Sequence, residues 1–221
     1  MKYYKDLEKQ VQFLISVLEI DKDSKGIDLG CGEGLHLKEL YKITKFITGI
    51  DIINYPDNPN FVKLDFFEDK LPFKNLDFAY ILAPYLDEKW WKIEKLLKNI
   101  NQTLKPNGSF ILDLFYYNFM KNNSVKQNFI IEKDRIILSK FIKEMDRVNL
   151  DRTIVNLKDK SQKNFTGSWR VFEFNELSEI LNQNGFYIYK QYADFDINKA
   201  LSWNNDKLPE RLIIHCKKYT I

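Results

Sequence analysis

The stretch GIDLGCGEG, Gly26–Gly34, is the feature that most constrains what this chain can fold into. A short apolar run ends in three glycines at alternate positions, Gly30, Gly32 and Gly34, and LHLKEL with helical leucine spacing follows. The pattern predicts a strand, a tight turn and a helix. In an α/β sheet such a turn accommodates a ligand at the strand ends, because backbone without a Cβ can be approached closely. A tight turn without a ligand is the alternative.

Strands and helices alternate over the first half of the chain, which predicts an α/β fold with a mostly parallel sheet and right-handed crossovers. Only nine residues, two of them proline, separate Asp51 from Phe61, so we expect a loop where a crossover helix would normally stand. The predicted strands are 26–30, 45–51, 61–65, 76–83 and 109–115, and the predicted helices are 6–20, 35–41 and 87–104.

The second half of the chain has a different pattern. Short β-leaning runs between charged turns predict a meander of three or four antiparallel strands, inserted over residues 128–174. A helix should follow, with Asn175 as its N-cap and Gly185 at its C-terminal end. Two strands, 186–192 and 210–218, should complete the sheet, joined by a loop. At 221 residues we expect one domain, in which the insertion is a lid or a dimerisation element.

Composition excludes several classes of protein. Cys31 and Cys216 lie far apart and the chain has two histidines, so we expect neither a disulfide framework nor a metal site. The 34 basic and 31 acidic residues are mixed along the chain, which favours a solvated surface over a nucleic-acid footprint. With no apolar run of about twenty residues and no signal peptide, a cytoplasmic protein without a membrane partner is expected.

Two acids at predicted strand ends point to an adenosine ligand, although each alone could be an ordinary surface acid. Asp51 stands about twenty residues after the glycines, where a carboxylate can accept hydrogen bonds from both ribose hydroxyls. Asp65 could accept from the exocyclic amine of adenine, with Phe66 against the ring. The nicotinamide fingerprint is GxGxxG, whereas GCGEG has Glu33 and Gly34 where a pyrophosphate would meet the helix. An adenosine without phosphates fits better.

These features together resemble the class I S-adenosylmethionine-dependent methyltransferases, of the Rossmann-like, small-molecule type. The resemblance covers nearly the whole chain, and the order and spacing of the segments make it specific. The segments are GIDLGCGEG, TGID, VKLDFFEDKLPF, LDFAYILAPYL, LKPNGSFILDLF, WRVFEFNELSEILNQNGFYIYKQY and ERLIIHCKK. The resemblance implies a seven-stranded, mostly parallel sheet whose last strand is antiparallel.

The resemblance also implies S-adenosyl-L-methionine as the cofactor and assigns contacts to it. The three glycines would pass under the methionine part, and Asp28 would help to bind its amino group. Asp51 would hold the ribose, with Ile52 beside it, and Ala83 would face the sulfonium. Asp65 and Phe66 would hold the adenine. Where the family has a helix after the ribose-binding acid, this chain has a loop, which leaves the adenine side differently covered.

Candidate contacts to the methyl acceptor lie where the family places its substrate. His36, Tyr85 and Arg170 are the candidates for a catalytic role. His36 could be a base or a residue at the helix surface or cofactor edge, and Arg170 could bind a carboxylate or pair with an acid. Other candidate contacts are Tyr3, Tyr4, Tyr116 and Tyr117, whereas Trp90 and Trp91 are expected to pack on a helix.

Methyl transfer needs no elaborate set of catalytic side chains, because the sulfonium already carries its leaving group. The inserted meander resembles the elements with which small-molecule members of the family cover the acceptor or form a dimer, and it lacks basic clustering. We therefore expect N- or O-methylation of a small molecule by in-line transfer, in a monomer or a homodimer. An RNA base methyltransferase is the alternative, with nucleic acid as a possible partner. A cofactor-binding protein without transferase activity is a further alternative.

Overall fold

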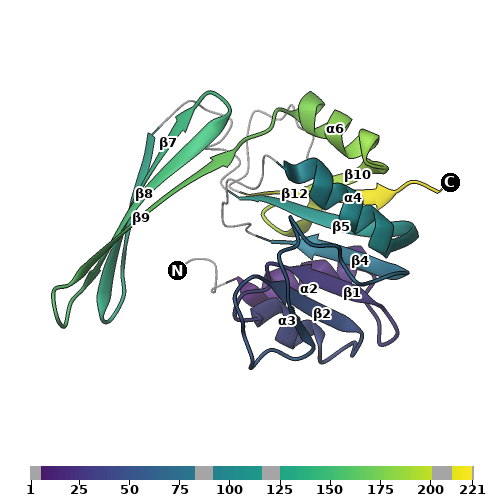
Figure 1. Ribbon diagram of the computed structural model, residues 1–221, viewed down its shortest axis with the longest axis horizontal. Coiled ribbons are helices and arrows are strands. Elements are labelled where there is room, and N and C mark those ends of the chain that lie inside the picture. Colours follow the sequence, from purple (N-terminus) through teal and green to yellow (C-terminus); the bar gives the residue numbers. More distant parts are fainter. Residues whose placement is uncertain (1–5, 83–91, 116–124, 201–210, 221) are drawn as a thin grey trace.

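The computed structural model describes residues 6–82, 92–115, 125–200 and 211–220. A central eight-stranded sheet has the order β11-β10-β12-β5-β4-β1-β2-β3, and a separate four-stranded sheet has the order β6-β7-β8-β9. The body of the protein is built on the first sheet, and the second extends away from it (Figure 1). The strands of the central sheet are β1 Gly26–Leu29, β2 Ile47–Asp51, β3 Phe61–Lys63, β4 Leu76–Ile81, β5 Leu104–Phe115, β10 Phe186–Ala193, β11 Asp196–Ala200 and β12 Arg211–Lys218.

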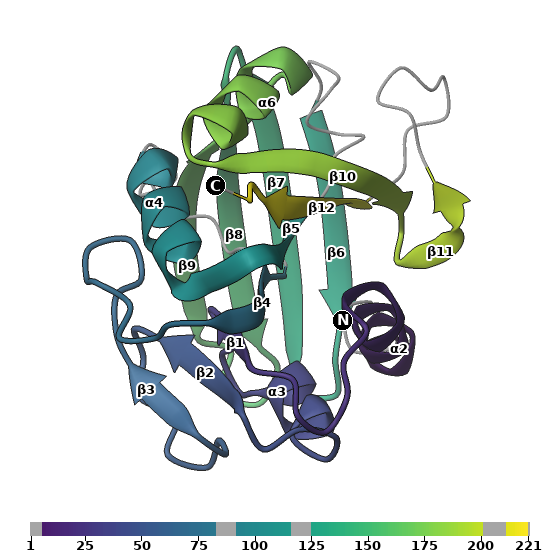
Figure 2. The ribbon, with the colours of Figure 1, turned by 90° about the vertical axis from the view of Figure 1, so that its right-hand side faces the viewer.

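The directions of the strands confirm the predicted Rossmann-like arrangement. Strands β3, β2, β1, β4 and β5 pair in parallel, and β12 is antiparallel to both β5 and β10. No helix occurs between β2 and β3. The eighth strand, β11, differs from the prediction, because we expected a loop there; it pairs antiparallel with β10 at the edge of the sheet (Figure 2).

Helices cover both faces of the central sheet. They are α2 Leu7–Leu18, α3 Leu35–Leu40, α4 Ile93–Thr103 and α6 Phe174–Gln183. Helix α6 begins two residues earlier than predicted: its N-cap is Glu173, an extended residue with φ −79° and ψ 155°, and the predicted N-cap Asn175 lies inside the helix. In the described parts of the chain, no helix is long and apolar enough to cross a membrane.

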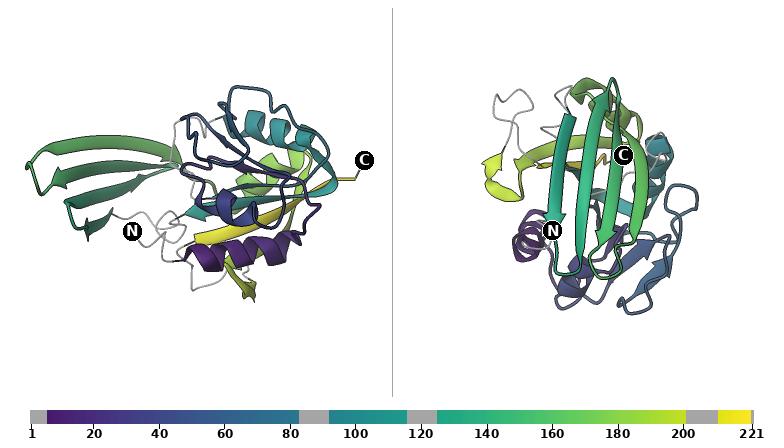
Figure 3. Two further views of the ribbon diagram at one scale, coloured as in Figure 1. Left: turned by 90° about the horizontal axis from the view of Figure 1, so that it is seen from below. Right: turned by 90° about the vertical axis from the view of Figure 1, so that its left-hand side faces the viewer.

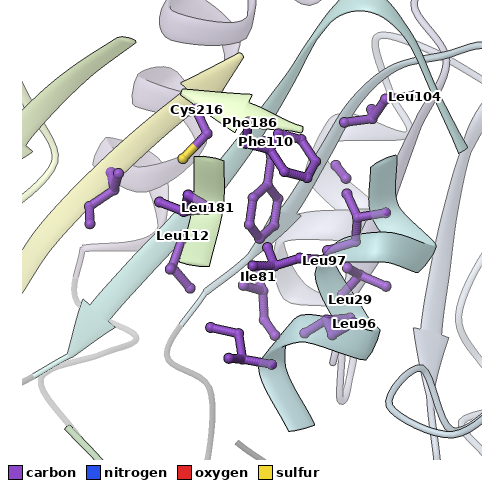
Figure 4. Packing of buried hydrophobic residues seen from close by; sticks show 14 of the residues in the cluster. Leu29, Ile81, Leu96, Leu97, Leu104, Phe110, Leu112, Leu181, Phe186 and Cys216 are labelled. Atoms are coloured by element: carbon purple, nitrogen blue, oxygen red, sulfur yellow. The ribbon is translucent and has the colours of Figure 1, made fainter. Parts of the chain in front are cut away.

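Two hydrophobic clusters lie on opposite faces of the sheet. One packs α4 and α6 against the strands (Figure 4). The other packs α2 and α3 against the opposite face. Strand β12 contributes to both, because Leu212 and Ile214 face the first cluster and Ile213 faces the second. Burial on both faces explains why Leu212, Ile213 and Ile214 are consecutive apolar residues. Labelled members of the first cluster include Leu29, Ile81, Leu96, Leu97, Leu112 and Leu181.

The insertion is a four-stranded antiparallel meander, which confirms the predicted pattern. Its strands are β6 Val125–Ile131, β7 Arg135–Glu144, β8 Arg147–Asn156 and β9 Gln162–Arg170. It projects from the body as a curved sheet (Figure 3), and its strands pass behind the central sheet in Figure 2.

The two faces of the meander differ in chemistry. Directly paired residues of antiparallel strands share a face. One face holds the buried residues Phe141, Val148 and Leu150, and the other exposes Phe129 and Ile131 at 69% and 67%. The face with the buried residues carries no acidic side chain within the four strands. Its basic residues are Lys126, Arg135, Lys143, Arg152 and Lys163.

A buried ion pair joins β5 to the start of β12. Arg211 Nε donates to Asp113 Oδ1 at 3.3 Å, and its Nη2 donates to the other carboxylate oxygen. The Asp113 side chain is fully buried and that of Arg211 is 11% exposed. The guanidinium also stacks on the Phe195 ring, with its carbon 4.3 Å from the ring centroid. The pair therefore fixes the reversed strand in the sheet.

We expect Asp113→Ala to lower the free energy of unfolding by about 3–5 kcal/mol, because it removes the carboxylate that pairs with the buried Arg211 guanidinium. Urea unfolding followed by circular dichroism measures the change. Glu39→Ala is the control, since Glu39 pairs with Lys42 on the surface, at 40% and 69% exposure. That variant should lose less than about 1 kcal/mol. Equal losses in the two variants would contradict the structural role of the buried pair.

Candidate functional site

The glycine turn follows β1 at the carboxyl end of the parallel strands. The Gly30 and Cys31 N–H groups both donate to the Ile50 carbonyl of β2, at 2.8 and 3.1 Å. All three glycines of the turn have positive φ: +74° at Gly30, +52° at Gly32 and +70° at Gly34. A side chain at any of them would therefore be strained.

The three glycines face different surroundings. A Cβ at Gly30 would lie 3.9 Å from the Phe66 ring, and a Cβ at Gly34 would overlap the Asn58 side chain. A Cβ at Gly32 would have no heavy atom of the described residues within 4 Å, apart from its own chain neighbours. Gly32 is thus the glycine of the turn that borders open space, where a ligand could approach the backbone.

The Asp51 carboxylate lies beside this open space and is oriented by the backbone. Its Oδ2 accepts the Gly32 N–H at 3.0 Å, and its Oδ1 accepts the Ile53 N–H at 2.9 Å. A carboxylate has about four acceptor positions, so each oxygen can accept one more hydrogen bond. The arrangement fits a pair of neighbouring hydroxyl groups, as in a ribose. Ile52, which follows, is 53% exposed.

Asp28 of β1 is buried beneath the turn, at 4% exposure. Burial raises the pKa of its carboxyl group to about 7; a hydrogen bond from Tyr80 opposes the rise, and the Asp51 charge adds to it. Burial and these two acids also raise the pKa of the Cys31 thiol well above its usual range. Cys31 is therefore a neutral, small side chain within the turn.

Asp65 and Phe66 follow β3 at the same edge of the sheet. Asp65 Oδ1 accepts the Phe67 N–H at 3.1 Å, and the Asp65 N–H donates to Asp69 at 3.0 Å. These bonds hold a tight turn. The Phe66 ring packs on the Phe67 ring, 4.9 Å between centroids, and reaches the glycine turn at Gly30. The structure thus brings the predicted adenine-binding segment against the glycine turn.

Asn58, in the loop between β2 and β3, is a site residue that the sequence did not reveal. Its amide Nδ2 donates to the Gly32 carbonyl at 2.8 Å. The contact spans 26 positions in the chain, and the segment around it has no periodic pattern. The one available signal was the absence of the usual helix between these strands.

His36 lies at the start of α3, buried at 7% exposure. Its Nε2 lies 2.7 Å from the Gln10 Oε1 of α2; with that oxygen as acceptor, Nε2 carries the proton. Burial lowers the pKa of His36 to about 4, and the charge of Arg211 contributes. The ring is therefore neutral at physiological pH and a weak proton acceptor. Gln10 was not predicted, because a buried glutamine has no distinctive spacing.

Arg170, the third catalytic candidate, ends β9 of the meander. Its guanidinium pairs with Glu176 at the start of α6 and lies over the Phe172 ring, 4.9 Å from the centroid. Of the two predicted possibilities, pairing with an acid is the one present. Other predicted residues lie outside the described residues. They are Tyr3, Tyr4, Ala83, Tyr85, Trp90, Trp91, Tyr116 and Tyr117.

Known proteins resemble this chain in sequence and in fold. A family described as a methyltransferase domain matches residues 2–191. The chain belongs to the methyltransferase family. The match spans most of the 221 residues and includes the glycine turn and the meander. The predicted membership of the methyltransferases is therefore confirmed.

Solved structures agree with the fold of this methyltransferase. An S-adenosylmethionine-dependent methyltransferase from Clostridium acetobutylicum superposes with a TM-score of 0.80 at 15% identity, over 97% of this chain and 93% of that one. The sugar N-methyltransferase KedS8 from Streptoalloteichus sp. superposes with a TM-score of 0.70 at 12% identity, over 99% of this chain and 92% of that one. At such identities the likeness shows the shared fold.

One characterised relative matches by sequence. The sterol 24-C-methyltransferase of Neurospora crassa is 28% identical over 123 residues. The match covers 49% of the methyltransferase described here and 32% of the relative, so this chain spans about a third of the relative's length.

We expect Asp28→Asn to change the pH dependence of stability. Burial raises the folded-state pKa of Asp28 to about 7, above the unfolded value of about 3.9. Its contribution to the free energy of unfolding is therefore lost as pH rises through this window. Asparagine stays neutral, so the variant should gain stability relative to wild type between pH 4 and 7. Urea unfolding at several pH values measures this difference, and a difference independent of pH would contradict the burial effect.

Proposed function

We propose that this chain is an S-adenosyl-L-methionine-dependent methyltransferase acting on a small molecule. One observation carries the proposal: the open space at Gly32 adjoins the Asp51 carboxylate, whose oxygens can each accept one more hydrogen bond. This suits an adenosine ligand whose sulfur-bearing chain continues over the turn. Asp65 and Phe66, held against the same turn, would hold the adenine.

The residues of the chain would act mainly by binding and orientation. The cofactor, when bound, supplies the methyl group and its leaving group. Asp51 would fix the ribose, and the peptide at Gly32 would lie against the methionine chain. Asp28, whose pKa is raised to about 7, lies below the turn. Orientation of the two reactants provides much of the rate enhancement in such a transfer.

The acceptor we propose is a small molecule with an amino or hydroxyl group, methylated on nitrogen or oxygen. The meander supports this proposal, because one of its faces combines a buried apolar centre, Phe141, Val148 and Leu150, with basic side chains. Such a face can cover a small polar molecule and exclude water, so we propose that the meander is a lid. The similar structure from Streptoalloteichus sp. is named as a sugar N-methyltransferase.

Methylation of an RNA base is the second candidate. The same face of the meander favours it, since Lys126, Lys143, Arg152 and Lys163 occur there without an acid. A phosphate backbone binds such a surface through ion pairs that release counterions. The apolar centre between these side chains fits a small molecule better.

Isothermal titration calorimetry with S-adenosylhomocysteine should show binding, and Asp51→Ala should weaken it at least about tenfold, because charged hydrogen bonds to the ribose are lost. Glu39→Ala is a matched control, an acid removed from the exposed face of α3, and should leave the affinity unchanged. Absence of binding to wild type would contradict the proposed cofactor. Methyl transfer from labelled cofactor to small amines or alcohols would then separate an enzyme from a non-catalytic binding protein.

Filter binding to bulk tRNA distinguishes the two acceptor classes. We expect weak binding that changes little between 50 and 200 mM salt, because a small-molecule site needs few phosphate contacts. An affinity that falls by about a thousandfold over this range would instead support the RNA candidate.

A further inference from the structure

We propose that Asn58 is a positioning residue for cofactor binding. Its side chain holds the Gly32 backbone in the orientation that the Asp51 carboxylate and the ligand require. The inference rests on the proposed function, since it concerns the same site. It assigns to a loop residue the task of fixing the glycine turn from outside the turn.

The Gly32 residue is held at both its polar groups by side chains. Its N–H donates to Asp51 Oδ2 at 3.0 Å, and its carbonyl accepts from Asn58 Nδ2 at 2.8 Å. A glycine can adopt several backbone conformations, and the one with φ +52° seen at Gly32 is one of them. Glycine also loses more conformational freedom on ordering than any other residue. The two side chains select this state, so the turn is ordered before a ligand arrives.

The orientation of the Asn58 amide is determined by its neighbours. Its side chain is buried, at 8% exposure, and Nδ2 also lies 3.7 Å from Cys31 Sγ. The opposite orientation would place Oδ1 against the Gly32 carbonyl, two acceptors together. In the observed orientation Oδ1 lies against Gly34 and finds no hydrogen-bond partner among the residues that the structure describes. A buried acceptor without a partner costs free energy, and the hydrogen bond from Asn58 Nδ2 to the Gly32 carbonyl must offset this cost.

Gly34 is explained by the same contact. Any side chain there would overlap Asn58, so the third glycine of GCGEG makes room for the loop rather than for the ligand. Asn58 and Gly34 therefore belong to one packing contact between the loop and the turn. The loop side chain fits against the turn only because the turn lacks a side chain at that position.

The loop that presents Asn58 has its own supports. The Asn58 N–H donates to the Tyr55 carbonyl at 3.1 Å, closing a turn that contains Pro56. The Tyr55 ring packs edge-on against Phe61, with centroids 6.4 Å apart. Farther along, Asn60 Nδ2 donates to the Ile47 carbonyl at 2.7 Å. The loop is thus fixed at several points, and Asn58 is the side chain that it directs to the glycine turn.

A pair of variants tests this role. Asn58→Ala removes the donor to Gly32, and Asn58→Asp keeps the shape but replaces the donor by an acceptor. The control is Asn101→Ala, which removes a side-chain amide that donates to another glycine carbonyl, that of Gly185, at 3.1 Å, where α4 meets the end of α6. Calorimetry with S-adenosylhomocysteine at 15 °C and the amide hydrogen-exchange rate of Gly32 are measured for each variant.

We expect both Asn58 variants to raise the Kd for S-adenosylhomocysteine about tenfold and to speed Gly32 amide exchange by a similar factor, because the donor is lost in both. Asn101→Ala should change each quantity less than about twofold, even where it lowers the melting temperature. If Asn58→Ala does not fold, the isosteric Asn58→Asp provides the same comparison.

Two negative results have different meanings. If wild type does not bind S-adenosylhomocysteine, the proposed function fails. If wild type binds and the Asn58 variants bind equally well, or if Asn101→Ala weakens binding as much as they do, the positioning role of Asn58 is overturned while the proposed function stands.

Discussion

The hydrogen bond from the Gly32 N–H to the Asp51 carboxylate is the interaction on which the site depends. It joins the turn after β1 to the end of β2, and both strands are positioned by the parallel sheet. Parallel strands bring their carboxyl ends to one edge, so residues nineteen positions apart become neighbours. The glycines allow the backbone to face this acid, and the acid orients the backbone in return.

The surroundings of this bond control the charges at the site. Asp28 and Asp51 lie close enough for one to raise the pKa of the other, and burial adds the larger effect on Asp28. His36 is neutral for the corresponding reason, since burial disfavours its charged form. The site therefore combines the Asp51 carboxylate, at the edge of the sheet, with two buried groups whose charged forms are disfavoured, Asp28 and His36. Such an environment is compatible with a cationic sulfonium ligand.

Sequence reasoning predicted the elements whose signals are local. The spacing of GCGEG and the position of Asp51 gave the turn and the strand end, and alternating runs gave the meander. The features that could not be predicted from the sequence depend on tertiary contacts. Strand β11 forms because the edge of β10 offers backbone partners, a preference that five residues within a polar loop do not carry themselves. Asn58 and Gln10 act through contacts between residues 26 positions apart, which no periodic pattern records.

A crystal structure with S-adenosylhomocysteine bound tests the central claim most directly. We expect the ribose hydroxyls within about 3 Å of the Asp51 oxygens and the sulfur-bearing chain over Gly32. A ligand bound elsewhere, or one whose ribose faces away from Asp51, would contradict it.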